Sequence, residues 1–244
     1  MKATDEIHIG TWMSAGSPVL TELAVECGLR WLLLDLEHGQ GEASLPDMLR
    51  ALRGSDTLGI VRVPALQSDV IARVLDWGAV GIMLPHTRSA EEAADCVAAM
   101  RYPPRGHRGV SRTVRAYGYG TREFTPLADA IFLPQIEDLT GVKAAHEIAH
   151  VEGVTALFVG PADLRHSLAH SEGEDVPDYE TSLEIVLDAA FDASRGAGLL
   201  LRDESLLSSH LDRGFRWIAI QSDLGILRDA YLRLSQLQKN TPLD

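Results

Sequence analysis

The chain is poor in the residues on which several kinds of enzyme chemistry depend. Its 244 residues include only two cysteines, Cys27 and Cys96, and these form no CxxC pair. We interpret both as packing residues of a protein from a reducing compartment, because disulfide frameworks and thiolate metal sites need more, or more closely spaced, cysteines. The lysines are Lys2, Lys143 and Lys239, and none of them ends an expected strand. A catalytic Schiff base therefore has no candidate nucleophile.

Positive charge and long apolar runs are also scarce. The formal net charge is -13, whereas nucleic-acid-binding chains usually present a basic face. No run approaches the ~18 apolar residues of a membrane span, and the N-terminal stretch MKATDEIHIGTW lacks the apolar core of a signal peptide. We therefore expect no nucleic-acid partner, no membrane association and a cytoplasmic location. The sequence also has no P-loop, no GxSxG and no GxGxxG after the first expected strand.

What the sequence does have is one pattern repeated eight times, a short apolar run followed by a segment with helical spacing. The expected strands are His8–Met13, Trp31–Glu37, Gly59–Ala65, Gly81–His86, Ala130–Glu137, Ala156–Gly160, Leu199–Arg202 and Trp217–Gln221. The expected helices are Val19–Cys27, Leu45–Leu52, Val70–Trp77, Ala90–Met100, Val142–His150, Tyr179–Arg195, Leu206–Arg213 and Leu224–Leu237. This alternation predicts an α/β fold, a single (β/α)8 TIM barrel over residues 1–244. An open doubly wound sheet is the alternative.

Two connections are longer than the usual few residues, Tyr102–Pro126 and Arg165–Asp178. Because we take both to follow strands, we expect both at the C-terminal face of the barrel, where active sites of this fold lie. The stretch from Arg101 to Arg122 has six arginines and no acidic residue. We expect it beside the mouth of the barrel, binding substrate carboxylates or a neighbouring subunit. Salt bridges to acidic helices are the alternative.

Polar and charged side chains gather at the expected strand ends. They are Asp35, Glu37, His38, Arg62, Gln135, Glu137 and Asp163. Glu137 and Asp163 follow neighbouring strands, which lie about 4.8 Å apart, so their carboxylates can share one cation. Oxygen ligands without a nearby cysteine favour Mg²⁺ or Mn²⁺, and a 2-oxo acid can chelate such an ion. The alternative is that Glu137 merely begins a helix, where a carboxylate suits the helix dipole.

Arg62 lies within the apolar run GIVRVPA. A guanidinium in an apolar strand needs an anionic partner, because arginine cannot be neutralised. It either pairs with Asp35 or Glu37, or it stabilises an enolate or alkoxide oxygen of a substrate.

The segment His146-Glu-Ile-Ala-His150 matches HExxH, the zinc-peptidase signature. It falls in an expected outer helix, away from the strand ends, and no third ligand is apparent downstream. We therefore assign no zinc site to it. We interpret His166 and His170 as solvated loop residues.

Six blocks of the sequence, in order, resemble those of the HpcH/HpaI aldolase family: WLLLDLEHG, VRVPA, LDWGAVGIMLPH, RYPPRGHRGV, PQIED and LFVGPADL. The resemblance runs from about Gly10 to Leu234. It implies a class II pyruvate aldolase with a (β/α)8 barrel. It also implies a homo-oligomer, usually a hexamer, in which a C-terminal helix, here about 224–239, is exchanged between neighbours.

The resemblance further implies roles for individual residues. The metal ligands fall on Glu137 and Asp163, which would hold Mg²⁺, Mn²⁺ or Co²⁺. The catalytic positions fall on His38, Asp35, Arg62 and Asp76, with Asp35 supporting His38. The substrate-binding positions fall on Arg62, Gln135, Gly160, Pro161, Ala162 and Asp163, where backbone amides near Ala162 and Asp163 hold the substrate carboxylate.

On this basis we expect a divalent-metal-dependent aldolase. It would reversibly cleave 4-hydroxy-2-oxo acids to pyruvate, or a related 2-oxo acid such as hydroxypyruvate, and an aldehyde, through an enolate held at the metal. An oxaloacetate decarboxylase with the same enolate site is the alternative, and a non-catalytic barrel that binds 2-oxo acids is a further one. Arg165 stands where the family usually has a small residue, and this departure lies on the aldehyde side of the site.

Overall fold

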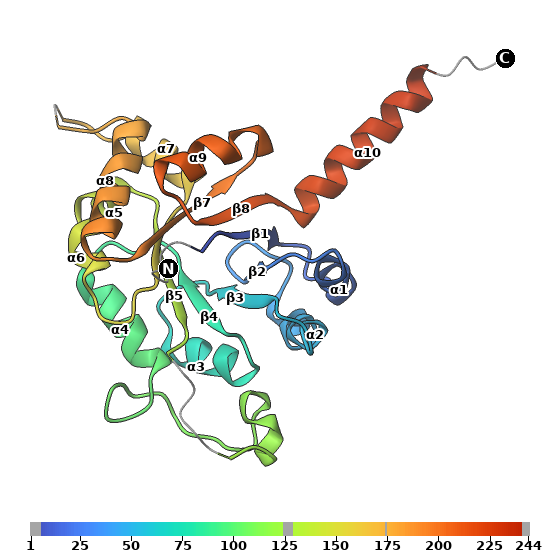
Figure 1. The fold of residues 1–244 in the computed structure, drawn as a ribbon, viewed down its shortest axis with the longest axis vertical. Coiled ribbons are helices and arrows are strands. Elements are labelled where there is room, and N and C mark those ends of the chain that lie inside the picture. Colours follow the sequence, from blue (N-terminus) through green and yellow to red (C-terminus); the bar gives the residue numbers. More distant parts are fainter. Residues whose placement is uncertain (1–5, 124–128, 174, 241–244) are drawn as a thin grey trace.

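A closed barrel of eight parallel strands forms the centre of the molecule (Figure 1). The computed structural model describes residues 6–123, 129–173 and 175–240. Each strand pairs with its neighbours in sequence, and β8 closes the barrel against β1. The strands are β1 (His8–Met13), β2 (Trp31–Asp35), β3 (Leu58–Arg62), β4 (Gly81–Leu84), β5 (Ile131–Ile136), β6 (Ala156–Val159), β7 (Gly196–Leu201) and β8 (Trp217–Ser222). The predicted (β/α)8 fold is confirmed.

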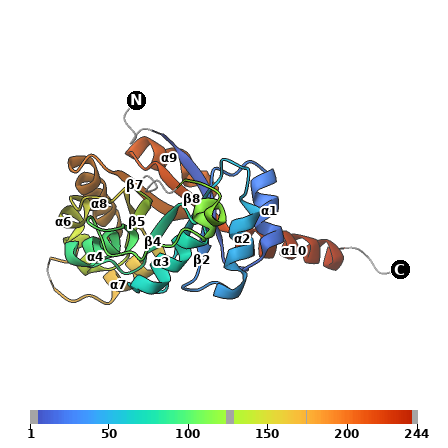
Figure 2. The same ribbon diagram turned by 90° about the horizontal axis from the view of Figure 1, so that it is seen from below.

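Helices surround the barrel (Figure 2). They are α1 (Pro18–Glu26), α2 (Leu45–Ala51), α3 (Ser68–Asp76), α4 (Ala90–Met100), α5 (Leu139–Lys143), α6 (Ala145–Ala149), α7 (Pro161–Ala169), α8 (Tyr179–Asp192), α9 (Leu207–Arg213) and α10 (Asp223–Asn240). Local signals start several of them: the side chains of Ser17, Ser89, Asp138 and Asp178 each accept a hydrogen bond from a backbone N–H of the first turn. None of the helices in the described ranges is long and apolar enough to cross a membrane.

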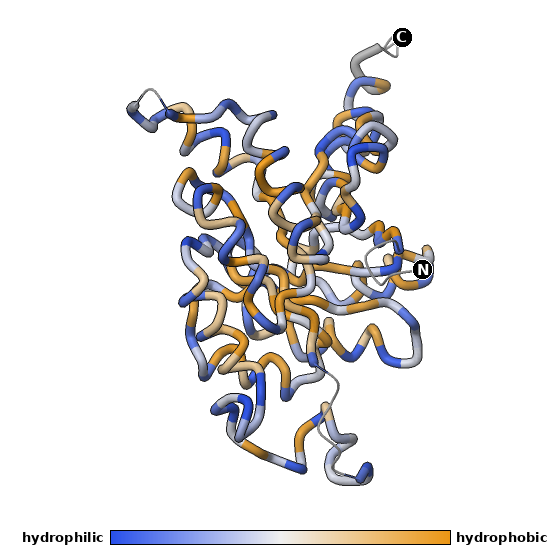
Figure 3. Tube along the Cα trace, turned by 60° about the vertical axis from the view of Figure 1, so that its left-hand side comes forward, coloured by the Kyte–Doolittle hydropathy of each residue, from blue (hydrophilic) through white to orange (hydrophobic). Residues whose placement is uncertain are grey.

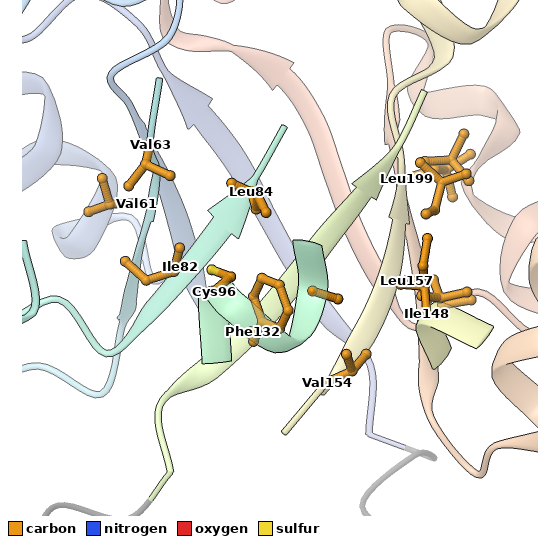
Figure 4. Packing of buried hydrophobic residues seen from close by; sticks show 14 of the residues in the cluster. Val61, Val63, Ile82, Leu84, Cys96, Phe132, Ile148, Val154, Leu157 and Leu199 are labelled. Atoms are coloured by element: carbon orange, nitrogen blue, oxygen red, sulfur yellow. The ribbon is translucent and has the colours of Figure 1, made fainter. Parts of the chain in front are cut away.

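The core has two parts, because successive strand residues point to opposite faces. Side chains such as Val61, Ile82, Phe132 and Leu157 point outward and pack under the helices (Figure 4). The other face fills the barrel itself. This inner cluster consists of Trp12, Trp31, Leu33, Ile60, Met83, Leu133, Ala156, Phe158, Trp217 and Ala219. Apolar residues accordingly concentrate along the central strands (Figure 3).

Three expectations about the elements are corrected. Strand β7 begins at Gly196, not at Leu199, because Gly198 is an interior position: a Cβ there would lie 2.5 Å from the carbonyl oxygen of Trp217. The expected helix Val142–His150 is divided into α5 and α6 at Ala144. The expected loop Arg165–Asp178 is partly helical, because α7 follows β6 directly and extends to Ala169.

The arginine-rich connection is also misplaced in the sequence interpretation. It follows α4 and leads into β5, so it lies at the N-terminal face of the barrel, opposite the strand ends that we expected it to flank. Arg115 donates to the carbonyl oxygens of Leu49 and Trp77, near the ends of α2 and α3. Arg101 and Arg105 form ion pairs with Asp129 and Glu152. These two arginines therefore form salt bridges, although with residues outside the helices, whereas Arg108 pairs with Asp76, the last residue of helix α3. Residues 124–126 of this connection lie outside the described ranges.

Candidate active site

The polar site is a continuation of the inner core. Along β2, Trp31 and Leu33 fill the barrel, and Asp35 is the next residue on the same face. Along β3, Arg62 follows Ile60 in the same way. Along β5, Gln135 and then Glu137 follow Leu133. The inward rows thus change from apolar to charged at the C-terminal ends of the strands, the end where TIM-barrel active sites lie.

Arg62 and Asp35 form a buried pair at this end. Nε and Nη2 of Arg62 donate to the two carboxylate oxygens of Asp35 at 2.9 and 2.7 Å. Asp35 also accepts from the indole of Trp12 and from the backbone N–H groups of Glu37 and His38. Burial alone would raise the pKa of Asp35, but these donors, led by Arg62, hold it below its usual value. Both side chains are fixed in orientation and charge.

Glu37 and two histidines surround this pair. Nη1 of Arg62 lies 2.7 Å from Oε2 of Glu37, so the expected pairing of Arg62 with Asp35 or Glu37 occurs with both. The His38 ring is largely exposed and lies 4.0 Å from Glu37. Asp35 therefore contacts the backbone of His38 and not its ring. The ring nitrogens of His86 lie 3.3 Å from Glu37 Oε1 and 3.1 Å from Glu137 Oε1.

His86 is the site residue that sequence reasoning missed. The sequence pattern predicts it only as the last residue of the fourth strand, at the polar end of IMLPH. Its backbone is left-handed, with φ of 49°, and its backbone N–H donates to Glu137 Oε1 at 2.8 Å. A positive φ is uncommon outside glycine and carries some strain. The turn is held by Thr87, whose N–H donates to the carbonyl of Gln135 and whose hydroxyl donates to that of Leu84.

Glu137 has the environment of a cation ligand. It is 2% exposed, and its Oε2 is buried and accepts no hydrogen bond from any residue that the structure describes. Oε1 of the neighbouring Gln135 is also buried and accepts no hydrogen bond from the described residues. Burial raises the pKa of Glu137 to about 7, against the opposing effect of the His86 contacts. A buried carboxylate oxygen without a donor costs free energy that a bound cation would offset.

Gly160 and α7 complete the space around this oxygen. A Cβ on Gly160 would lie 2.3 Å from Glu137 Oε2 and 2.7 Å from the Gln135 amide nitrogen, so the close approach requires glycine here. Pro161, Ala162 and Asp163 form the first turn of α7, with exposed Ala162 and Asp163. Strand β6 pairs with β5, which brings this turn beside Glu137. The donor set, two carboxylates and an amide oxygen with no thiolate, fits Mg²⁺ or Mn²⁺.

Asp76 is not brought to the site within one chain. It ends α3 on the N-terminal side of the barrel, where it pairs with Arg108 at 2.6 Å. It also lines a surface cavity of about 680 Å³ at that end, together with residues such as Arg115 and Tyr119. The strand ends with Asp35, Arg62 and Glu137 are at the opposite end of the barrel.

Comparison with known proteins decides the family. The sequence model of the HpcH/HpaI aldolase/citrate lyase family matches residues 8–230. The chain belongs to this family. A hydroxypyruvate/pyruvate aldolase of Roseobacter denitrificans is 37% identical over 227 residues, which cover 91% of this chain and 89% of the relative. A 5-keto-4-deoxy-D-glucarate aldolase of Klebsiella pneumoniae is 36% identical over 241 residues, covering 97% and 94%.

The fold is also shared with solved structures of the HpcH/HpaI family. A family member from Burkholderia cenocepacia superposes with a TM-score of 0.89 at 33% identity, covering 97% of this chain and 96% of that one. The resemblance inferred from the six sequence blocks is thereby confirmed. The chain is a lyase of the aldolase type.

Proposed function

We propose that the chain is a divalent-metal-dependent aldolase that reversibly cleaves 4-hydroxy-2-oxo acids to pyruvate, or a related 2-oxo acid such as hydroxypyruvate, and an aldehyde. The observation that carries the proposal is the buried Oε2 of Glu137, which accepts no hydrogen bond from the described residues and lies beside Gly160 and the first turn of α7. The names of the relatives, a hydroxypyruvate/pyruvate aldolase and 5-keto-4-deoxy-D-glucarate aldolases, support the substrate class.

Glu137 and Asp163 would hold the metal, Mg²⁺ or Mn²⁺ with Co²⁺ as a further candidate, and Gln135 would support it. Bound there, the ion would supply Lewis-acid polarisation of the 2-oxo group. His86 fixes Oε1 of Glu137 through its backbone N–H and one ring nitrogen, which leaves Oε2 as the oxygen to present to the cation. Partners of this kind orient metal ligands in many proteins.

The remaining groups act on the substrate. The backbone N–H groups of Ala162 and Asp163 lie in the first turn of α7, where a carboxylate is favoured by the unpaired amides and the helix dipole. Arg62, fixed by Asp35 and Glu37, supplies the positive charge that stabilises the enolate of the departing 2-oxo acid. His38, exposed at the mouth, takes the proton of the C4 hydroxyl as the C3–C4 bond breaks.

We further propose that the active form is a homo-oligomer, in keeping with the expected hexamer. Helix α10 extends away from the barrel (Figure 1) and exposes Leu224, Ile226, Tyr231 and Leu232. Exposed apolar side chains of this kind suit exchange between neighbouring subunits. Because Asp76 lies at the opposite end of the barrel from His38, a catalytic role for Asp76 requires that a neighbouring subunit present it.

The decisive experiment follows exchange of the C3 protons of pyruvate in D₂O by NMR. We expect exchange that depends on Mg²⁺ or Mn²⁺ and is lost in Glu137→Ala and Asp163→Ala. Glu184→Gln, an exposed carboxylate change on α8, is the matched control and should exchange like the parent. No exchange by the metal-loaded parent would contradict a pyruvate donor. Pyruvate release from oxaloacetate, without any aldehyde cleavage, would instead establish the decarboxylase alternative.

A further inference from the structure

A second group of metal-ligating side chains lies on the outer surface, away from the strand ends. His146 in α6 and His150 directly after it are joined by Asp192, the last residue of α8. One ligand atom of each residue lies within 4.8 Å of the other two. Helices α6 and α8 pack side by side at the edge of the barrel (Figures 1 and 2). The third ligand that the sequence did not reveal thus comes from a different helix.

The two imidazoles lie one helical turn apart, and one nitrogen of the His150 ring remains available to a metal. They are four residues apart on one helical face, with ring centroids 5.5 Å apart and planes 16° from parallel. Nδ1 of His150 lies 2.9 Å from the carbonyl oxygen of His146, which leaves Nε2 to receive a metal. Metal-binding histidines commonly donate their other nitrogen to a backbone carbonyl in this way. Nε2 of His146 lies 3.6 Å from Oδ2 of Asp192.

The chemistry of this group differs from that of the active site. Two imidazole nitrogens and one carboxylate suit Zn²⁺, which binds such donors at about 2.0–2.2 Å, whereas Mg²⁺ prefers oxygen ligands. The three ligand atoms lie within 4.8 Å of one another, and all three side chains are exposed. Small side-chain rotations would therefore bring each ligand atom to its bonding distance from one zinc ion. A water molecule would complete four-coordination. The surface cavity of about 680 Å³ at the N-terminal face is lined by other residues, so it does not bring a peptide substrate to this group as the HExxH signature would require.

We propose that His146, His150 and Asp192 form a Zn²⁺ site that clamps α6 to α8, separate from the proposed active site. An ion pair between His146 and Asp192 would need only one imidazole, whereas the second ring beside it provides the third donor. An ion that binds only the folded chain stabilises it by mass action. Metal binding should therefore raise the melting temperature without being required for catalysis.

The test is calorimetric titration of chelator-treated protein with ZnCl₂ in saturating Mg²⁺, with melting temperatures measured in parallel. We expect a single equivalent of Zn²⁺ to bind and to raise the melting temperature. His146→Ala, His150→Ala and Asp192→Asn should each weaken binding at least about tenfold, the loss typical even of a residue that only supports a ligand. Repeating the titration in Glu137→Ala keeps the active site from contributing.

The chain contains a matched control. His166 and His170 in and after α7 are also four residues apart, with ring centroids 4.3 Å apart, but no third ligand joins them among the residues that the structure describes. The double variant His166→Ala/His170→Ala should retain the zinc affinity of the parent. Equal affinity in the parent and in Asp192→Asn or His150→Ala would overturn the proposal, as would absence of zinc binding by the parent. Neither result would bear on pyruvate proton exchange, which tests the aldolase proposal.

Discussion

Glu137 makes the metal-free protein sensitive to pH in an unusual direction. Its pKa is raised from the ordinary 4.5 to about 7, chiefly by burial. The folded state then binds more protons than the unfolded state between these values. This stabilising contribution is complete below pH 4.5 and is lost as the pH rises through about 7. Between pH 5 and pH 8 the loss amounts to about 2–3 kcal/mol.

The assay is urea unfolding of the chelator-treated parent and of Glu137→Gln at several pH values. The difference between the free energies of unfolding of the parent and of Glu137→Gln should fall by about 2–3 kcal/mol from pH 5 to pH 8. The corresponding difference in melting temperature is roughly 5–10 °C for a chain of this size. Adding Mn²⁺ at pH 8 should raise the free energy of unfolding of the parent again. The increase should be about 2.7 kcal/mol when the free Mn²⁺ concentration is a hundred times the dissociation constant.

Two comparisons make this prediction refutable. Glu184→Gln, on the exposed face of α8, measures the effect of removing a carboxylate charge that is not buried. If the difference between the parent and Glu137→Gln does not change with pH, the carboxyl ionises normally in the folded state. In that case burial of Glu137 would not explain why a cation should bind there.

Five further perturbations test the site and the oligomer. Arg62→Ala should destabilise the fold by about 3–5 kcal/mol in urea unfolding, because it leaves the charge of Asp35 buried without its partner. Gly160→Ala should weaken Mn²⁺ binding, measured by electron paramagnetic resonance, at least about tenfold, since its Cβ would displace Oε2 of Glu137. His86→Ala should also weaken Mn²⁺ binding by about 10–100-fold, whereas His38→Ala should leave it unchanged and abolish cleavage of the hydroxy acid. Deleting residues 224–244 should reduce the oligomer to smaller species in light scattering, and unchanged mass would refute helix exchange.

The fold and the inward charged row were predictable because both follow from short-range periodicity. The alternation of Trp31, Leu33 and Asp35 on one face of β2 is already present in the sequence, and the same rule places Arg62 and Glu137. The contacts of Arg62 were also among the alternatives that its chemistry allowed. The predicted seventh strand begins only at Leu199 and omits Gly196 and Gly198, whereas Gly198 belongs to β7 and leaves room for Trp217 and Phe158.

What the sequence could not supply are juxtapositions made by tertiary structure. His86 reaches two carboxylates only because its backbone turns back at a positive φ, which no periodic pattern encodes. Asp192 joins His146 only because α8 returns to pack on α6. The arginine-rich segment lies at the N-terminal end of the barrel, and not at the predicted C-terminal end, because α4 reverses the chain direction between β4 and this segment.

The position of the charged row also explains how this barrel combines stability with reactivity. Deep in the barrel, the inward-facing side chains are apolar, and Trp31, Phe158 and Trp217 pack against one another there. Two residues further along the same face, the single guanidinium of Arg62 faces the two carboxylates of Asp35 and Glu37. Among the described residues, no arginine or lysine lies within ion-pair distance of Glu137, and its basic neighbour is the ring of His86. Three carboxylates therefore stand against one guanidinium, and the excess negative charge lies around Glu37 and Glu137. On the proposed function, a divalent cation would remove this excess without filling the space that a 2-oxo acid needs. The charge imbalance that destabilises the metal-free chain would then favour binding of the cofactor.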